Sequence, residues 1–326
     1  MEPTDSCAPA CRVAILGASR NAEAVIHRRA VLAFFCFAFF ADAAAPQPLA
    51  AGSARLPLYR FGVTPWQHGQ SADDIRSLYK PLLEWLGQRV GAEFAIVGAT
   101  GYGEMIDLLA YESIDLASIS PVPFVLAKLR NPSVTMLVTE LSWDFGNNRK
   151  NPSYEGFIIA RADRDDIVGL ETLRGSRFGF VRKQSSSGYV YPVAHFISNQ
   201  INFKTFFSRV YFLGSQPRVT DAVASGSIDA GATWDYNLKQ PTNKHGPIFK
   251  IVAKTGTIPN LGIAANSSVP SMMQLKIREA LLAAEETLFR GLPASGYVVK
   301  DDAYYDTVRD VVRLVSGAPG LVGEDK

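Results

Sequence analysis

Residues 104–119, EMIDLLAYESIDLASI, align without gaps on residues 218–233, RVTDAVASGSIDAGAT, with five identities in sixteen positions. Each copy reads as an amphipathic helix that runs into a strand. Such units look alike in any α/β protein, but the two copies stand in the two halves of the chain, which favours a common architecture. Ligands of open α/β sheets bind outside the carboxyl ends of strands, so residues 118–121 and 233–235 are expected to face one cleft.

Apolar runs alternate with amphipathic stretches along most of the chain on either side of these copies, as is typical of α/β proteins. Helices are predicted at residues 73–90, 272–290 and 303–314. Strands are predicted at LYRFGV, EFAIVG, IDLASIS, VTMLVTEL, EGFIIAR, RFGFV, RVYFLG, IDAGATW, FKIVAK and LGIAA.

The composition is that of a globular protein, with 326 residues of which 47% are hydrophobic and 20% are charged. This length is sufficient for two domains with separate cores. The formal net charge is only +2, and lysine and arginine are scattered along the chain. Nucleic acid is therefore not expected as a partner, because binding its backbone requires a concentrated basic face.

The N-terminal region has the features of a secretory signal peptide. His27, Arg28 and Arg29 precede the apolar run AVLAFFCFAFF, and the small residues ADAAA follow it. This order predicts a signal peptide over residues 1–43, and a linker rich in Pro, Ala, Gly and Ser follows at 44–57. The apolar run is too short for a membrane-spanning helix, which takes about 20 residues. An uncleaved anchor and a buried helix are the alternatives.

Cysteine usage agrees with export of the protein. Cys7, Cys11 and Cys36 all precede the predicted cleavage site, so the mature chain would contain no thiol. Cys36 could alternatively carry a lipid anchor, but phenylalanines rather than small residues precede it, and it lies inside the apolar run.

The sharpest local motif is the serine cluster, which we define as Ser185, Ser186 and Ser187. It follows the predicted strand RFGFV, is followed by Gly188, and opens a segment that reads as a helix. Free backbone N–H groups at a helix start, together with serine hydroxyls, form a site for a tetrahedral oxyanion. The alternative is a simple N-cap, but a cap needs only one serine.

Two tyrosines and one carboxylate are further candidates for contacts in the cleft. Tyr102 begins the helix before IDLASIS, and Tyr154 stands just before the strand EGFIIAR. Either hydroxyl could donate to an anion, or either ring could simply pack at the rim. Asp235 follows the strand IDAGATW and could cap a helix, accept a proton from a bound oxyanion, or pair with a ligand amine.

Signatures of catalysis or metal binding are absent from the sequence. It contains no HExxH, no metal-ligand spacing, no GxSxG and no GxxxxGK[ST] motif, so no catalytic residue, metal or cofactor is expected. His195 reads as a packed helix histidine. A hydrolase on the same fold is the alternative, and it would need a base such as His68 or His195 near the serine cluster.

From about Tyr59 to Leu314 the chain resembles the phosphonate/phosphite-binding periplasmic components of ABC transporters. The motifs that carry the resemblance, in order, are FGVTP, YKPLLEWLGQRVG, YGEMIDLLAYESIDLASISPVPFVLA, FGFVRKQSSSGYVYP, AVASGSIDAGATW and TIPNLGIAA. Their order and spacing make the match far more specific than any single motif.

The resemblance implies a two-lobed type II periplasmic-binding-protein fold, in which each lobe is a central mixed sheet flanked by helices and the ligand lies in the interlobe cleft. Lobe 1 would comprise residues 58–153 and 257–326, and lobe 2 residues 154–256. The ligand-binding residues implied are the serine cluster, Tyr102, Ser120, Tyr154, Gln216 and Asp235. Gln216 departs from the family, because a histidine is expected at this position.

The function implied is capture of a phosphonate, phosphite or phosphate-like oxyanion in the periplasm. The partners expected are the small oxyanion and an ABC transporter permease, and the protein is expected to be a monomer. The alternative is a periplasmic sensor module that binds a different small anion for a membrane signalling partner. It would bind its ligand in the same way, so the sequence leaves the choice open.

Overall fold

The structure is a computed structural model that describes residues 55–64, 71–144, 149–239 and 245–317. The predicted signal peptide, its three cysteines, most of the predicted linker and His68 lie outside the described residues. Among the helices formed by the described residues, none combines the length and apolar character that crossing a bilayer requires.

The first sheet has six strands in the order β13-β4-β12-β3-β1-β2. Its strands are β1 (Leu58–Val63), β2 (Glu93–Gly98), β3 (Leu116–Ile119), β4 (Thr135–Glu140), β12 (Gly262–Ala265) and β13 (Tyr297–Val298). β1 pairs in parallel with β2 and β3, whereas β12 is antiparallel to β3 and β4. The sheet is therefore mixed.

The second sheet has five strands in the order β11-β7-β10-β8-β9. Its strands are β7 (Ser153–Arg161), β8 (Arg177–Phe180), β9 (Arg209–Phe212), β10 (Ala230–Trp234) and β11 (Phe249–Pro259). β8 is parallel to β9 and β10, and β7 is antiparallel to β10 and β11. A separate two-stranded pair consists of β5 (Ser142–Asp144) and β6 (Arg149–Asn151).

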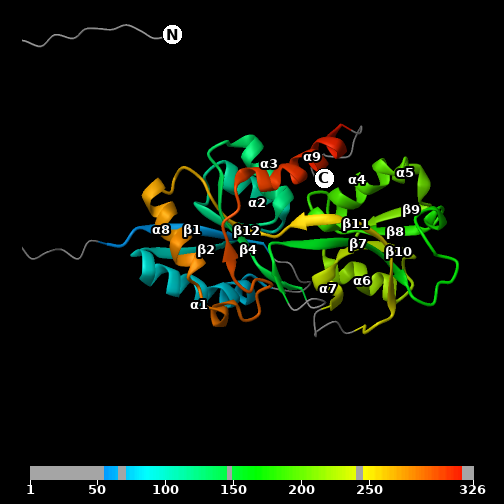
Figure 1. Ribbon diagram of the computed structural model, residues 1–326, viewed down its shortest axis with the longest axis horizontal. Coiled ribbons are helices and arrows are strands. Elements are labelled where there is room, and N and C mark those ends of the chain that lie inside the picture. Colours follow the sequence, from blue (N-terminus) through cyan, green and yellow to red (C-terminus); the bar gives the residue numbers. More distant parts are fainter. Residues whose placement is uncertain (1–54, 65–70, 145–148, 240–244, 318–326) are drawn as a thin grey trace, which may run out of the picture. The chain divides into compact units, whose positions relative to one another are not determined.

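Helices cover both faces of the sheets (Figure 1). In the second sheet, α4 and α5 lie on one face and α6 and α7 on the other. α9 packs against both α3 and α4, and so contacts helices that belong to different sheets. The helices are α1 (Ala72–Val90), α2 (Tyr102–Ala110), α3 (Pro121–Arg130), α4 (Tyr191–Ser198), α5 (Phe203–Phe206), α6 (Gln216–Ala224), α7 (Asp235–Lys239), α8 (Ser271–Leu282) and α9 (Asp306–Ser316).

The sequence explains where α1 begins and ends. The Ser71 hydroxyl accepts a hydrogen bond from Asp74 N at 3.1 Å, and the Asp74 carboxylate accepts one from Ser71 N at 2.8 Å. This reciprocal cap satisfies two N–H groups that have no partner within the helix. The helix ends at Gly91, whose φ of 70° is left-handed and favours glycine.

The predicted α/β class and all the predicted strands are confirmed. The prediction of one helix over 272–290 is wrong, because α8 ends at Leu282 and a 3₁₀ turn follows at Glu286–Phe289. Apolar residues keep the helical period across this break, so the pattern does not reveal that Glu285 is extended. Similarly, a 3₁₀ turn at Asp302–Tyr305 precedes α9. The division into lobe 1, at residues 58–153 and 257–326, and lobe 2, at residues 154–256, stays a prediction.

The first copy of the sequence repeat is held by an ion pair between Arg60 at the start of β1 and Asp115 before β3. Asp115 accepts hydrogen bonds from Arg60 N at 2.6 Å, Nε at 3.0 Å and Nη2 at 2.7 Å. Arg60 Nη2 also donates to the Glu112 carbonyl at 2.9 Å. These contacts fix β1 beside β3 at their amino ends. We call this arrangement of an aspartate before one strand and an arginine in the neighbouring strand a clamp.

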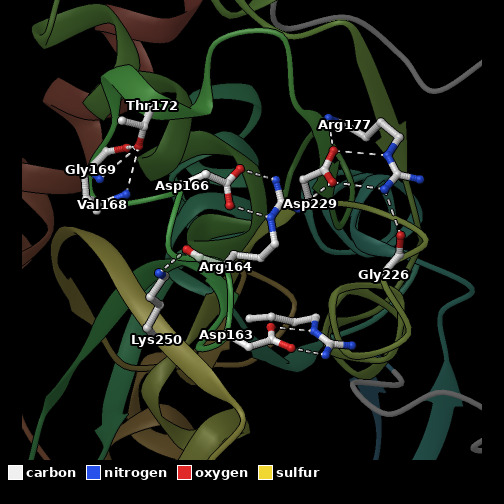
Figure 2. Close-up of polar contacts among 11 residues, drawn as sticks. Asp163, Arg164, Asp166, Val168, Gly169, Thr172, Arg177, Gly226, Asp229 and Lys250 are labelled. Atoms are coloured by element: carbon white, nitrogen blue, oxygen red, sulfur yellow. Dashed lines mark hydrogen bonds and ion pairs between the residues drawn. The ribbon is translucent and has the colours of Figure 1, made fainter.

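The second copy carries the same clamp, in which Asp229 stands at the position aligned with Asp115 (Figure 2). Asp229 accepts hydrogen bonds from Arg177 N at 2.8 Å, Nε at 3.1 Å and Nη2 at 3.0 Å, and Arg177 Nη2 donates to the Gly226 carbonyl at 2.8 Å. Arg164 adds a second ion pair to Asp229 at 2.8 Å. The clamp fixes β8 beside β10, as Arg60 and Asp115 fix β1 beside β3.

Each strand that carries a clamp arginine also contains a glycine two residues later, Gly62 in β1 and Gly179 in β8. A Cβ on Gly62 would lie 2.4 Å from Ile114 Cδ1, and one on Gly179 would lie 2.5 Å from Ile228 Cδ1. Ile114 and Ile228 occupy the same aligned position of the repeat. Each glycine therefore makes room for the isoleucine before the neighbouring strand, and the common architecture of the two copies extends to individual contacts.

The serine cluster lies on an unusual turn. A π-helix at Ser186–Val190 leads into α4, and the Ser185 hydroxyl caps it by accepting a hydrogen bond from Gly188 N at 3.2 Å. A Cβ on Gly188 would lie 2.4 Å from Val181 Cγ2. Gly188 thus allows the turn to pack directly on the end of β8. Single π-turns are rare and occur frequently at functional sites.

We predict that Asp229→Asn lowers the free energy of unfolding by about 2 kcal/mol, because the charge-assisted bonds to Arg177 and Arg164 are lost. Hydrogen bonds from Arg177, and then from Arg164, hold the pKa of Asp229 below its ordinary value of 3.8. The stabilisation is therefore present above that pH and disappears as the pH falls below it. Urea unfolding at neutral pH measures the loss, and a series from about pH 5 to 3 should show a weaker acid dependence in the variant.

Asp310→Asn is the matched control, because Asp310 pairs with Arg313 while its side chain is 70% exposed. Exposed pairs contribute little, so this change should leave unfolding nearly unaltered. Equal effects of the two substitutions would contradict the role of the clamp.

We predict that Gly188→Ala destabilises the protein by about 1 to 3 kcal/mol, because the new methyl group would collide with Val181 and force the turn off β8. Gly169→Ala is the control, since no atom lies within 4 Å of a Cβ at that position. Thermal unfolding compares the two variants. If Gly188→Ala is as stable as Gly169→Ala, the π-turn does not depend on close packing.

Candidate functional site

A pocket of about 270 Å³ lies at the carboxyl ends of strands from both sheets. Thr64 follows β1, Ser120 follows β3, Val181 follows β8 and Trp234 ends β10, and all four line the pocket. The repeat thus brings its two copies to one cavity, as the alignment predicts. The other lining residues are Thr100, Gly101, Tyr102, Tyr154, Arg182, Ser185, Ser186, Ser187, Gly214, Ser215, Gln216, Arg218, Leu261 and Pro293.

The serine cluster forms one wall of this pocket, and all three serines are buried. The Ser186 hydroxyl accepts a hydrogen bond from Val122 N in α3 at 3.2 Å. The Ser187 hydroxyl accepts one from Gln216 Nε2 in α6 at 3.0 Å. The first N–H groups of the π-turn have no partner within it, so the wall presents hydrogen-bond donors to the cavity.

Two further helices begin at the pocket, at equivalent positions of the repeat. Tyr102 is the first residue of α2, and Gln216 is the first residue of α6. Helix N-termini carry partial positive charge and favour anions. In addition, Ser215 Oγ and Gln216 Oε1 are buried without a hydrogen-bond partner among the described residues. Buried polar atoms in this state are available to a ligand.

The two predicted tyrosines both line the pocket as neutral hydroxyls. Burial raises the pKa of Tyr102, and a hydrogen bond with Ser185 and the charge of Arg182 only partly oppose that shift. Burial also raises the pKa of Tyr154 well above its ordinary value, against the lowering effect of hydrogen bonds with Ser187 and Ser186. Both tyrosines therefore keep the proton that they could donate to an oxyanion.

Trp234 provides an apolar wall beside these donors. Its ring meets that of Tyr154 edge to face, with centroids 5.1 Å apart and an interplanar angle of 75°. Leu261 and Pro293 also line the cavity. The pocket can therefore accommodate a polar group on one side and a small apolar substituent on the other.

Sequence reasoning missed the charged residues of the pocket, which are Arg182 and Arg218. Arg182 Nε donates to the Gly214 carbonyl at 2.9 Å. A Cβ on Gly101 would lie 2.8 Å from Arg182 Nη1, so the guanidinium packs directly over Gly101. The φ of Gly101 is −177°, which any residue adopts, and the glycine is therefore explained by space alone. The position of Arg182 shortly before the serine cluster is the sequence signal that could have indicated a role in the pocket.

Seven of the eight predicted ligand-binding residues line this pocket, and Asp235 does not. Asp235 begins α7, where its carboxylate accepts a hydrogen bond from Tyr236 N at 2.8 Å. Its predicted contact with the ligand stays a prediction.

His195 lies in α4 and does not line the pocket either. Burial lowers the pKa of His195. Within the described parts of the chain, no group of three His, Cys, Asp or Glu residues could hold a metal ion.

Several known proteins resemble the chain along most of its length. The Phosphate-import protein PhnD of Mycolicibacterium smegmatis is 26% identical over 267 residues, which cover 74% of this chain and 82% of the relative. A binding protein component of an ABC phosphonate transporter from Pseudomonas aeruginosa superposes with a TM-score of 0.66 at 20% identity, covering 82% of this chain and 90% of that structure. PhnD1 from Prochlorococcus marinus in complex with methylphosphonate gives a TM-score of 0.67 at 17% identity, covering 79% and 98%. The two structures show the same fold.

Residues 61–305 match the family of ABC transporter, phosphonate, periplasmic substrate-binding proteins. Members of this family bind a solute and are not enzymes, so the hydrolase alternative is set aside. The resemblance inferred from the motifs is confirmed. The chain therefore belongs to the phosphonate-binding family of periplasmic substrate-binding proteins, and it is the substrate-binding component of a phosphonate or phosphate ABC transporter.

Proposed function

We propose that the pocket binds a phosphonate, phosphite or phosphate, and that the exported protein, acting as a monomer, delivers this oxyanion to a membrane permease. The observation that carries the proposal is the convergence of the serine cluster, two neutral tyrosine hydroxyls and the starts of α2, α6 and the π-turn on one small cavity. The relatives named for phosphate import and for methylphosphonate support the same ligand class.

The arrangement suits a tetrahedral anion with three oxygens on one side. Hydroxyl-bearing side chains line the pocket from three elements, with Tyr102 from α2, Tyr154 from β7 and the serine cluster from the start of the π-turn. Hydrogen bonds to a charged group contribute about 1.5 to 3 kcal/mol each, so a handful supports micromolar or tighter binding. The apolar wall at Trp234 leaves room for the substituent on phosphorus.

Ligand binding would couple the two sheets. Tyr102 and Ser120 come from elements of the first sheet, and the serine cluster and Gln216 come from elements of the second. A ligand stabilises a closed arrangement only when it contacts both sides, because only differential affinity shifts a conformational equilibrium. An oxyanion held by Tyr102 and the serine cluster meets this requirement.

We predict that Ser186→Ala combined with Tyr102→Phe weakens methylphosphonate binding by about 100-fold or more, since two hydrogen bonds to the anion are lost. Titration calorimetry measures the affinity, and thermal unfolding verifies that the variant folds. Tyr111→Phe combined with Ser133→Ala is the control, because both residues are exposed and lie outside the pocket. Unchanged affinity in the first double variant would overturn the assignment of these residues.

A further inference from the structure

Arg182 lies against the residues that precede two helices. Its Nε donates to the carbonyl of Gly214, which stands just before the N-cap of α6, at 2.9 Å. Its Nη1 packs on Gly101, the N-cap residue of α2. The guanidinium is thereby held at the wall of the pocket, between the starts of the equivalent helices of the repeat.

This position is electrostatically unfavourable for a cation on its own. Helix N-termini carry partial positive charge, and a neighbouring positive side chain is destabilised there. Among the described residues no carboxylate pairs with Arg182, whose only hydrogen bond is to the Gly214 carbonyl. No ion pair within the described part of the protein therefore occupies this guanidinium, which leaves it able to pair with an anionic ligand.

The two copies of the repeat differ in charge in the first turn of α2 and α6. In α2, Glu104 accepts hydrogen bonds from Thr100 N at 2.7 Å and Thr100 Oγ1 at 2.6 Å, which is the favourable arrangement at a helix start. The aligned residue in α6 is Arg218, and it lines the pocket. No aspartate or glutamate is among the described lining residues, so both charged lining side chains are positive.

We propose that Arg182 makes this pocket select oxyanions that bring two negative charges. The inference rests on the proposed function and narrows its ligand class to the dianions of phosphonates, phosphite or phosphate, with a substituent on phosphorus that is neutral or acidic. Monoanionic sulfonates are poor ligands, and so are aminoalkylphosphonates, whose ammonium group offsets one negative charge. Arg182 makes the direct contact with the anion that distinguishes the dianions from these poorer ligands.

The remaining groups of the pocket cannot supply this selectivity. Serine, tyrosine and glutamine side chains are neutral donors that serve a sulfonate as well as a phosphonate. Tyr102 and Tyr154 keep their protons near neutral pH, because burial raises the pKa of both. The guanidinium groups of Arg182 and Arg218 are the cationic donors among the described lining residues. Any pH dependence of binding therefore follows the ionisation of the ligand.

Titration calorimetry with methylphosphonate, methanesulfonate and 2-aminoethylphosphonate tests the proposal, because the first two have the same tetrahedral shape and differ in charge. At mildly alkaline pH the protein should bind methylphosphonate at least about tenfold more tightly than either of the others, as one charge-assisted contact predicts. Arg182→Gln should weaken methylphosphonate binding by about 10- to 100-fold and methanesulfonate binding much less. Arg182→Lys should restore most of the difference in affinity between methylphosphonate and methanesulfonate.

Arg209→Gln is the matched control, because its guanidinium lies over the Tyr211 ring and does not line the pocket. Equal weakening of both ligands by Arg182→Gln, or tighter binding of 2-aminoethylphosphonate by the unmodified protein, overturns the charge selection and leaves the proposed function standing. Absence of binding to every phosphorus oxyanion overturns both.

A pH series on the unmodified protein keeps the test independent of any variant that fails to fold. Affinity for methylphosphonate should rise as the pH passes through the second ionisation of the ligand, and affinity for methanesulfonate should stay constant. A flat profile for methylphosphonate contradicts selection of the dianion.

Discussion

The ion pairs of Asp115 with Arg60 and of Asp229 with Arg177 set the geometry on which the rest of the structure depends. In each half an aspartate before one strand holds the arginine at the start of its neighbour through the same set of hydrogen bonds. Fixing the amino ends of these strands also fixes where their carboxyl ends lie, and those ends carry the helix starts that form the pocket. The position of the pocket is thus a consequence of strand register in two equivalent units.

A second constraint acts where the chain passes between the sheets. Asn260 is buried, and its Nδ2 contacts the Glu140 carbonyl at 2.9 Å, Ser142 Oγ at 3.0 Å and the Asn151 carbonyl at 2.8 Å. Glu140 ends β4, Asn151 ends β6, and Asn260 directly follows β11. One amide therefore ties together the segments that leave each sheet. The passage of the chain between the sheets is therefore held by side-chain hydrogen bonds as well as by the backbone.

Much of the fold could be predicted from the sequence because its signals are local. Strands such as RFGFV are continuous apolar runs, and the two helix-strand units repeat with the clamp aspartates at identical positions. The break after α8 was missed, since Ile277, Leu281 and Leu288 keep one helical period while the backbone at Glu285 becomes extended. The residues 142–151 gave no alternating pattern, although they contain β5 and β6.

The site was predicted where residue type alone indicates chemistry, as in the serine cluster and Tyr102. Arg182 was not, because its role depends on contacts with Gly101 and Gly214, which are distant in sequence and adjacent only in the fold. Asp235 lies one residue beyond the lining position, and its contact with the ligand stays a prediction. Its position after a strand resembles that of Ser120, but it is Trp234 that stands at the aligned position and lines the pocket.

We propose that one phosphorus oxyanion is held jointly by both halves of the repeat. A crystal structure of the protein with methylphosphonate would show whether this is so. We expect phosphonate oxygens within hydrogen-bond distance of the serine cluster, Tyr102 and Arg182, with the methyl group toward Trp234. A ligand bound elsewhere, or one contacted by the elements of a single sheet, would contradict it.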